Sequence, residues 1–105
     1  MNLVLVGLSH KTAPVDIREK FHFPQPQLPE ALELLRTRYE AQEGMILSTC
    51  NRVEVLAQTG DSPEGVRQVK DFICNFHKVP YDTLQQFLYD FTQIDAVRHV
   101  FRVAA

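Results

Sequence analysis

The sequence predicts an α+β domain built on a four-stranded antiparallel sheet, with two helices on one face and a further helix at the C-terminal end. Three observations predict it. The chain begins with an almost continuously apolar run, two candidate strands follow one another closely in its middle, and amphipathic helical segments separate the strands. The length of 105 residues suits one small domain with a single hydrophobic core.

The first half of the chain contains one strand and one long helix. Asn2–Leu8 is apolar almost throughout, which is typical of a central strand that is buried on both faces. Pro14 ends regular pairing, and we expect a short helix around Arg18 after it. A proline-rich connector leads to a helix over about 27–42, where Pro29 suits the first turn. The helical spacing predicts its buried face as Leu28, Ala31, Leu32, Leu35 and Tyr39.

The middle of the chain predicts two neighbouring antiparallel strands followed by a helix. Met45–Thr49 is the first strand, and alternation over 52–57 predicts the second. Ser62 is the expected N-cap of the helix, with Pro63 at its first position. The helix's buried face is predicted as Val66, Val69, Phe72, Ile73 and Phe76. Cys74 falls outside this stripe.

A fourth strand is expected around Phe87–Phe91, and a last helix is expected from about Thr92. The order is therefore β-α-β-β-α-β followed by a helix, which is the split βαβ, ferredoxin-like arrangement. The last helix stops in mid-pattern without a glycine or a polar cap, so we expect that the chain was cut from a longer protein.

Composition argues against several classes of function, although Arg36, Arg38, Lys70 and Lys78 leave room for a local basic patch. The net charge of −2 argues against a general nucleic-acid-binding protein, which needs a basic excess to displace counterions from phosphates. The four glycines are scattered, without a G-x-G-x-x-G or P-loop pattern, and no metal-binding spacing of Cys and His is present. The chain shows no signal peptide and no membrane span, and its two cysteines form no disulfide framework, which predicts a reducing, cytoplasmic setting.

Cys50 is the first candidate for chemistry, because it comes just after a predicted strand rather than within one. The residues beside it are polar or charged: Ser48, Thr49, Asn51 and Arg52. Most free cysteines are small buried hydrophobes, and that alternative stays open. A cation such as Arg52 near the sulfur would instead favour the thiolate, which is the nucleophilic form.

The histidines supply a second candidate. His99 lies among apolar residues of the last helix and is expected to face the interior, either as a core histidine or as a general acid/base near the thiol. His10 follows the first strand, at a sheet edge where functional loops often gather. His22 and His77 are expected at the surface.

Two long motifs and one short one resemble a known family. "GLSHKTAPVDIREKF" near the N-terminus, "LSTCNRVEV" in the middle and "HVFRVAA" around His99 resemble the N-terminal domain of the glutamyl-tRNA reductases. The resemblance covers essentially the whole chain, 1–105. It implies the NADPH-dependent reduction of glutamyl-tRNA to glutamate-1-semialdehyde, which is the first step of tetrapyrrole (porphyrin) biosynthesis.

The resemblance also implies roles for particular residues. Cys50 would be the nucleophile that attacks the ester of glutamyl-tRNA and becomes a thioester. Thr49 and Arg52 would help to hold the glutamate, Asn51 would contribute through the backbone of the loop, and His99 would be the histidine that affects activity. A guanidinium is suited to this task because it grips a carboxylate with two parallel hydrogen bonds.

The family extends beyond this chain, into an NADPH-binding domain and a helical domain that forms a homodimer. The resemblance therefore implies that this chain alone binds no NADPH and at most forms or hydrolyses the thioester. Two other classes stay open on the residues alone. One is a binding module without chemistry, in which Cys50 is structural, and the other is a small thiol hydrolase that uses Cys50 and His99.

Overall fold

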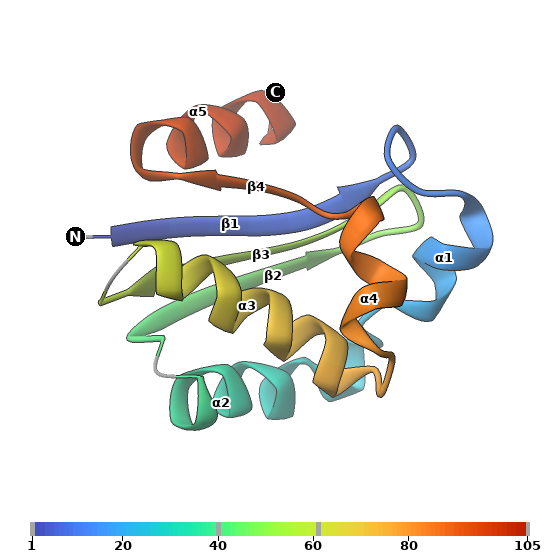
Figure 1. Ribbon diagram of the computed structural model, residues 1–105, viewed down its shortest axis with the longest axis horizontal. Coiled ribbons are helices and arrows are strands. Elements are labelled where there is room, and N and C mark those ends of the chain that lie inside the picture. The colour runs from blue at the N-terminus through green and yellow to red at the C-terminus, as the bar shows by residue number, and fades with distance from the viewer. Residues whose placement is uncertain (1, 40, 61, 105) are drawn as a thin grey trace.

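The computed structural model describes residues 2–39, 41–60 and 62–104, without the side chain of Ser62. Figure 1 shows the helices and strands in their order along the chain. They are β1 (Asn2–Ser9), α1 (Val15–Lys20), η1 (Gln25–Gln27), α2 (Leu28–Arg38), β2 (Glu43–Ser48), β3 (Arg52–Thr59), α3 (Ser62–Phe76), α4 (Tyr81–Leu84), η2 (Gln85–Phe87), β4 (Tyr89–Thr92) and α5 (Gln93–Ala104).

The four strands form one sheet in the order β2-β3-β1-β4, and all three neighbouring pairs are antiparallel. β1 is a central strand, as its apolar run predicted, and it is buried from Val4 to Ser9. β3 lies between β1 and β2, so the two strands that α2 connects are not neighbours. The predicted antiparallel sheet with its flanking and C-terminal helices is confirmed.

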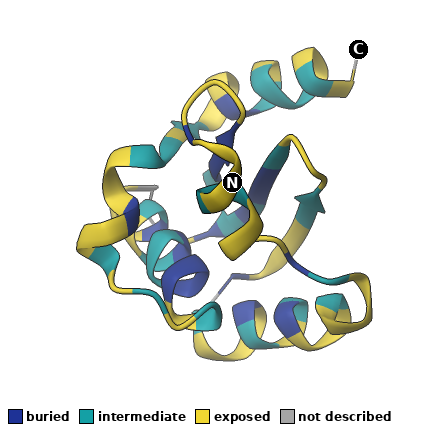
Figure 2. Ribbon diagram, turned by 90° about the vertical axis from the view of Figure 1, so that its right-hand side faces the viewer, coloured by how far each residue is buried: buried dark blue, intermediate teal, exposed yellow. Residues whose placement is uncertain are grey.

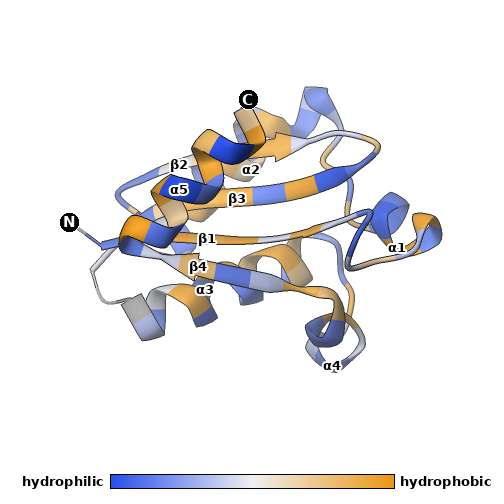
Figure 3. Cartoon of the chain, turned by 90° about the horizontal axis from the view of Figure 1, so that it is seen from above, coloured by the Kyte–Doolittle hydropathy of each residue, from blue (hydrophilic) through white to orange (hydrophobic). Residues whose placement is uncertain are grey.

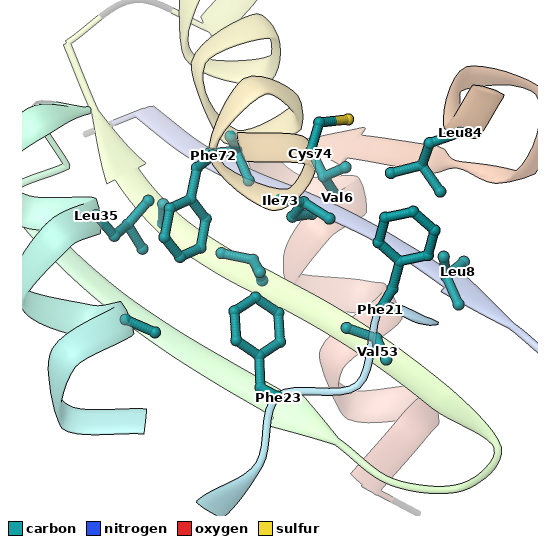
Figure 4. Close-up of a cluster of buried hydrophobic side chains, with 14 of the residues drawn as sticks. Val6, Leu8, Phe21, Phe23, Leu35, Val53, Phe72, Ile73, Cys74 and Leu84 are labelled. Carbon is teal, nitrogen blue, oxygen red and sulfur yellow. The ribbon is translucent and has the colours of Figure 1, made fainter. Parts of the chain in front are cut away.

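The helices lie on both faces of this sheet. α2 and α3 cover one face, whereas α5 lies across the opposite face, where it follows β4 and crosses β1 toward β3 (Figures 1 and 3). Buried residues gather on the strands and on the helix sides that face them (Figure 2). The main core fills the space between the sheet and α3, where Phe21, Phe23 and Phe72 are almost completely buried (Figure 4).

The structure corrects several predicted boundaries, including that of β4, which begins at Tyr89 rather than near Phe87. α2 ends at Arg38 rather than near residue 42, because the chain turns there to enter the sheet. The Ala41 amide donates to the Leu35 carbonyl, and the Gln42 amide donates to the Gln58 carbonyl of β3 at 2.9 Å. Pairing with β3 therefore begins before Met45, where the strand was predicted to start.

The start of α3 was predicted one residue late. Ser62 is the first residue of α3 rather than its N-cap, and its side chain lies outside the described part. Cys74 was also predicted off the buried stripe, which is wrong, because it is 2% exposed. α4 packs against α3, so the buried side of α3 is wider than the sheet alone would make it. In the described residues, no helix is both long and apolar enough to cross a bilayer.

Candidate functional site

The β2–β3 turn, residues Thr49–Arg52, carries the predicted nucleophile. Cys50 is exposed and is a free thiol. The Thr49 amide donates to the Arg52 carbonyl at 2.8 Å, and the Thr49 hydroxyl oxygen accepts from the amides of Asn51 and Arg52 at 3.2 and 3.1 Å. The Thr49 side chain therefore fixes the two backbone amides that follow Cys50 in the chain.

The two central residues of this turn, Cys50 and Asn51, explain why the Thr49 side chain is needed to close it. Two-residue hairpins favour turns whose central residues have positive φ, for which Asn-Gly is preferred. Cys50 and Asn51 are not among the described non-glycine residues with positive φ, which are Lys78 and Gln93. The Thr49 hydroxyl thus accepts from the Arg52 amide and replaces a backbone acceptor in closing the turn.

A buried carboxylate lies two residues after the turn. Glu54 of β3 is 5% exposed, and its Oε2 accepts hydrogen bonds from three side chains. Arg52 Nη1 donates at 3.2 Å, His99 Nε2 of α5 donates at 2.5 Å, and the Tyr89 hydroxyl of β4 also donates. Glu54 therefore brings together Arg52 and His99, two of the predicted site residues, from different elements. We call Arg52, Glu54, Tyr89 and His99 the Glu54 cluster.

The strand register explains how these side chains meet. Gly7 of β1 lies opposite Glu54 on β3 and opposite Tyr89 on β4, so the three residues share one face of the sheet. A Cβ atom at Gly7 would lie 2.7 Å from Cγ of Glu54 and 2.6 Å from the Val53 carbonyl oxygen. Because Gly7 has no side chain, the Glu54 side chain can pass over β1 and reach Tyr89 on β4.

The surroundings of the Glu54 cluster determine which of its side chains donate hydrogen bonds. Burial, and then the hydrogen bond to Glu54, raise the pKa of the Tyr89 hydroxyl above its usual value, so this hydroxyl remains a donor. The His99 ring stacks on Phe91 with centroids 4.7 Å apart. Its Nε2 is committed to Glu54, and its Nδ1 is buried without a hydrogen-bond partner among the described residues.

An open cavity of about 470 Å³ lies beside the cluster. It is lined by Ser9, Lys11, Thr12, Arg52, Tyr89, Phe91, His99, Arg102 and Val103. Its three cationic side chains, Lys11, Arg52 and Arg102, suit an anionic ligand. Thr49, Cys50 and Asn51 are not among the described residues that line it, so the turn and the cavity share only Arg52.

The exposure of the other histidines differs in part from the prediction. His22 is exposed as expected, and His10 is exposed at the end of β1. His77, also expected at the surface, is half-buried. Its ring packs against Phe21, Phe23 and Phe76, and its nitrogens contact the carbonyl oxygens of Ile73 and His22 at 2.8 and 3.1 Å. Its position after the last predicted core residue of α3 concealed this burial.

Sequence reasoning missed Glu54 and Tyr89. Alternation in 52–57 placed Glu54 on the polar side of its strand, where a charged residue needs no partner. The only signal in the sequence was a glycine inside the apolar first strand, which often marks a close approach of another group. That signal identifies a partner only when the register of the strands is known.

The model of the family described as "Glutamyl-tRNAGlu reductase, N-terminal domain" matches residues 6–105. The chain belongs to this family. Curated glutamyl-tRNA reductases from Pelobacter propionicus and Geobacter sulfurreducens are 45% and 48% identical over all 105 residues. The solved glutamyl-tRNA reductase from Methanopyrus kandleri is 28% identical over 97% of the chain, with a TM-score of 0.65. The chain spans only about a quarter of these relatives, 24% of the Pelobacter protein and 22% of the Methanopyrus chain.

Proposed function

We propose that this chain forms the thioester intermediate of glutamyl-tRNA reduction on Cys50. The observation that carries the proposal is the exposed, free Cys50 in a turn whose backbone is fixed by hydrogen bonds, in a chain of this family. A thiol needs its thiolate form and a fixed approach to react, and a preformed turn supplies the second requirement.

The proposed step balances as an acyl transfer. The Cys50 thiol loses its proton, and its sulfur attacks the ester carbonyl of glutamyl-tRNA. The bond from the acyl carbon to the ribose oxygen breaks, the ribose hydroxyl leaves with a proton, and a glutamyl thioester remains on Cys50. An ester that is already activated needs a good nucleophile and correct orientation more than a strong acid.

The residues around Cys50 would hold the glutamyl group. Arg52 gives one guanidinium nitrogen to Glu54 and keeps other donors for the free side-chain carboxylate of the substrate. Thr49 shapes the turn through its hydroxyl, and Asn51 contributes through its backbone. His99 contacts Glu54, so we assign it a role in positioning Arg52 through that carboxylate.

NADPH does not fit the residues present. Gly7 and Gly44 lie inside strands, where an added Cβ would meet neighbouring atoms at 2.6 Å. Gly60 and Gly65 lie at the β3–α3 junction but lack the G-x-G-x-x-G spacing of a dinucleotide-binding turn. We therefore assign no NADPH step to this chain. In the longer relatives we expect NADPH binding and homodimer formation elsewhere in the protein, with the reaction taking place in the cytoplasm on glutamyl-tRNA.

An acid-quenched intact-mass measurement tests the proposal. The chain is mixed with glutamyl-tRNA in the absence of NADPH, beside Cys50→Ser, which removes the nucleophile. We expect a glutamyl adduct on the parent chain that is absent from the variant. A binding module would give no adduct on a folded chain, and a thiol hydrolase would release glutamate in repeated turnovers while the adduct stays at a low steady level.

A further inference from the structure

One other segment of the chain holds the β2–β3 turn. It is residues 9–20, the end of β1 together with the following loop and α1, and we call it the 9–20 segment. The His10 amide donates to the Asn51 carbonyl at 2.8 Å. Arg18 of α1 donates from Nε to the Cys50 carbonyl at 3.1 Å and from Nη1 to the Ala13 carbonyl at 2.7 Å.

These contacts add to those that Thr49 makes with the turn backbone. The Thr49 hydroxyl takes the amides of Asn51 and Arg52, whereas the 9–20 segment takes the carbonyls of Cys50 and Asn51. The peptide groups that follow Cys50 and Asn51 are therefore held on both sides. Fixing these peptides restricts the direction in which the Cys50 side chain leaves the backbone.

The 9–20 segment is a firm support rather than a loose loop. The Ser9 amide donates to the Thr12 hydroxyl oxygen at 3.0 Å, and the Ala13 amide donates to the Ser9 carbonyl at 2.9 Å. Ser9 and Ala13 are each 4% exposed. Arg18 thus connects Cys50, through Ala13, to the buried end of the central strand.

Packing fixes the backbone of α1 but does not direct the side chain of Arg18. No residue of α1 is fully buried, although Ile17 is partly buried against the core. The Arg18 guanidinium instead bridges two carbonyl oxygens from segments far apart in the chain. The rigid fork of a guanidinium can hold two acceptors in fixed relative positions, which the single ammonium group of a lysine does less well.

We infer that Arg18 is a positioning residue for Cys50, which orients the sulfur for attack on the glutamyl ester. The inference rests on the proposed function. Arg18 makes no contact with the substrate in this role and acts through the Cys50 backbone. Misplacing a reacting group by about 1 Å can lower a rate about a hundredfold, so loss of this support affects the acyl transfer more than simple thiol chemistry.

The test compares Arg18→Ala and Arg18→Lys with Arg36→Ala, a control whose guanidinium pairs with Glu33 on the surface. Two rates are measured for each chain, glutamyl transfer to Cys50 and alkylation of Cys50 by iodoacetamide. We expect Arg18→Ala to lower the transfer rate about 10- to 100-fold. Alkylation should change less than about threefold, because a small reagent needs no fixed approach. Arg18→Lys should give an intermediate transfer rate, and Arg36→Ala should match the parent.

Each other outcome is informative. Equal transfer rates in Arg18→Ala and Arg36→Ala would overturn the inference. Parallel loss of transfer and alkylation in both Arg18 variants would also overturn it, in favour of a general structural role. If the parent chain forms no adduct, the proposed function fails. In that case, NMR order parameters of the Cys50 and Asn51 amides test the role of Arg18 separately. Values that Arg18→Lys leaves unchanged would show that Arg18 does not hold the turn.

Discussion

Two cysteines in this chain have opposite surroundings. Cys50 is exposed in the β2–β3 turn, whereas Cys74 is buried between α3 and its neighbours. Burial, with a smaller effect of Asp71, raises the pKa of the Cys74 thiol to about 11. At pH 8 only about one Cys74 thiol in a thousand would be ionised, so alkylation of Cys74 should be at least about a hundredfold slower than that of Cys50.

Iodoacetamide labelling followed by peptide mass analysis checks this prediction. The folded parent should take up one label, on Cys50, and a second only when denaturant is added. Cys50→Ser should remain unlabelled under native conditions. Rapid labelling of Cys74 in the folded chain would show that the space between α3 and α4 opens readily.

His77 makes stability depend on pH. Burial among phenylalanine rings lowers its pKa from 6.5, and this outweighs its contacts with two carbonyl oxygens, which favour the protonated ring. Below pH 6.5 the unfolded chain therefore binds more protons at this site than the folded chain. The free energy of unfolding gained from neutral His77 should be complete above pH 6.5 and decrease as the pH falls toward the lowered value.

Urea unfolding at pH 7.5 and pH 5.5 measures this dependence, with His77→Gln as the comparison. Glutamine can still donate to a carbonyl, but it does not titrate. The parent should lose more stability between the two pH values than the variant loses. An equal loss in both chains would assign the pH dependence to other groups.

The candidate site shows which residue roles a sequence can predict. Thr49, Cys50, Asn51 and Arg52 are contiguous, so their proximity follows from the chain itself. Glu54 and Arg18 were not identified as site residues, because their importance comes from partners that are distant in sequence. The guanidinium of Arg52, which was expected near the thiol, also pairs with Glu54, a partner that the sequence did not indicate.

At the scale of elements, long periodic segments were predicted well and their ends were not. β1 and the apolar stripe of α3 have many residues in one pattern, so each residue supports the same assignment. The end of α2 depends on a turn that lets Gln42 pair with Gln58 on β3, a contact that no local pattern contains. α4 has only four residues, too few to show a period.

A substitution at Gly7 tests how tightly β1 packs against β3 and the side chain of Glu54. Gly7→Ala would place a methyl group within 2.7 Å of both the Val53 carbonyl oxygen and Cγ of Glu54, so the side chain of Glu54 or the strand must move. We expect unfolding to become easier by about 1–3 kcal/mol, as is typical of overpacking. Glutamyl transfer to Cys50 should also slow, because Glu54 would no longer hold Arg52 in place.

Urea unfolding and the transfer assay measure the two effects. Gly60→Ala is the matched control, because an added Cβ there meets no described atom within 4 Å. The control should change stability by less than about 0.5 kcal/mol. If Gly7→Ala were as stable as the control, the sheet would have room to adjust at this crossing.

At the scale of the whole molecule, the two faces of the sheet are joined to their helices in different ways. α2 and α3 pack on one face through the aromatic core (Figure 4). On the other face, α5 has one buried residue, Ala96, and exposes Ile94 and Phe101. Gln93 at the start of α5 hydrogen-bonds to Asn2 and Leu3 of β1, and His99 in its middle donates to Glu54. The Glu54 cluster therefore helps to hold α5 on the sheet and is also part of the candidate site.

Glu54→Gln should therefore loosen α5 before it loosens the rest of the chain. All three donors of the cluster converge on one carboxylate oxygen, and replacing the carboxylate by an amide removes the charge and leaves at least one buried donor poorly satisfied. The expected cost is about 1–3 kcal/mol. Hydrogen exchange measures it residue by residue, since amides of α5 should exchange faster while those of β1 keep their protection. Glu33→Gln, a change in an exposed surface pair, should leave both sets unaltered. Unchanged protection of α5 in Glu54→Gln would mean that apolar contacts and the Gln93 hydrogen bonds are enough to hold this helix on the sheet. Lost protection throughout the chain would mean that α5 and the main core unfold as one cooperative unit.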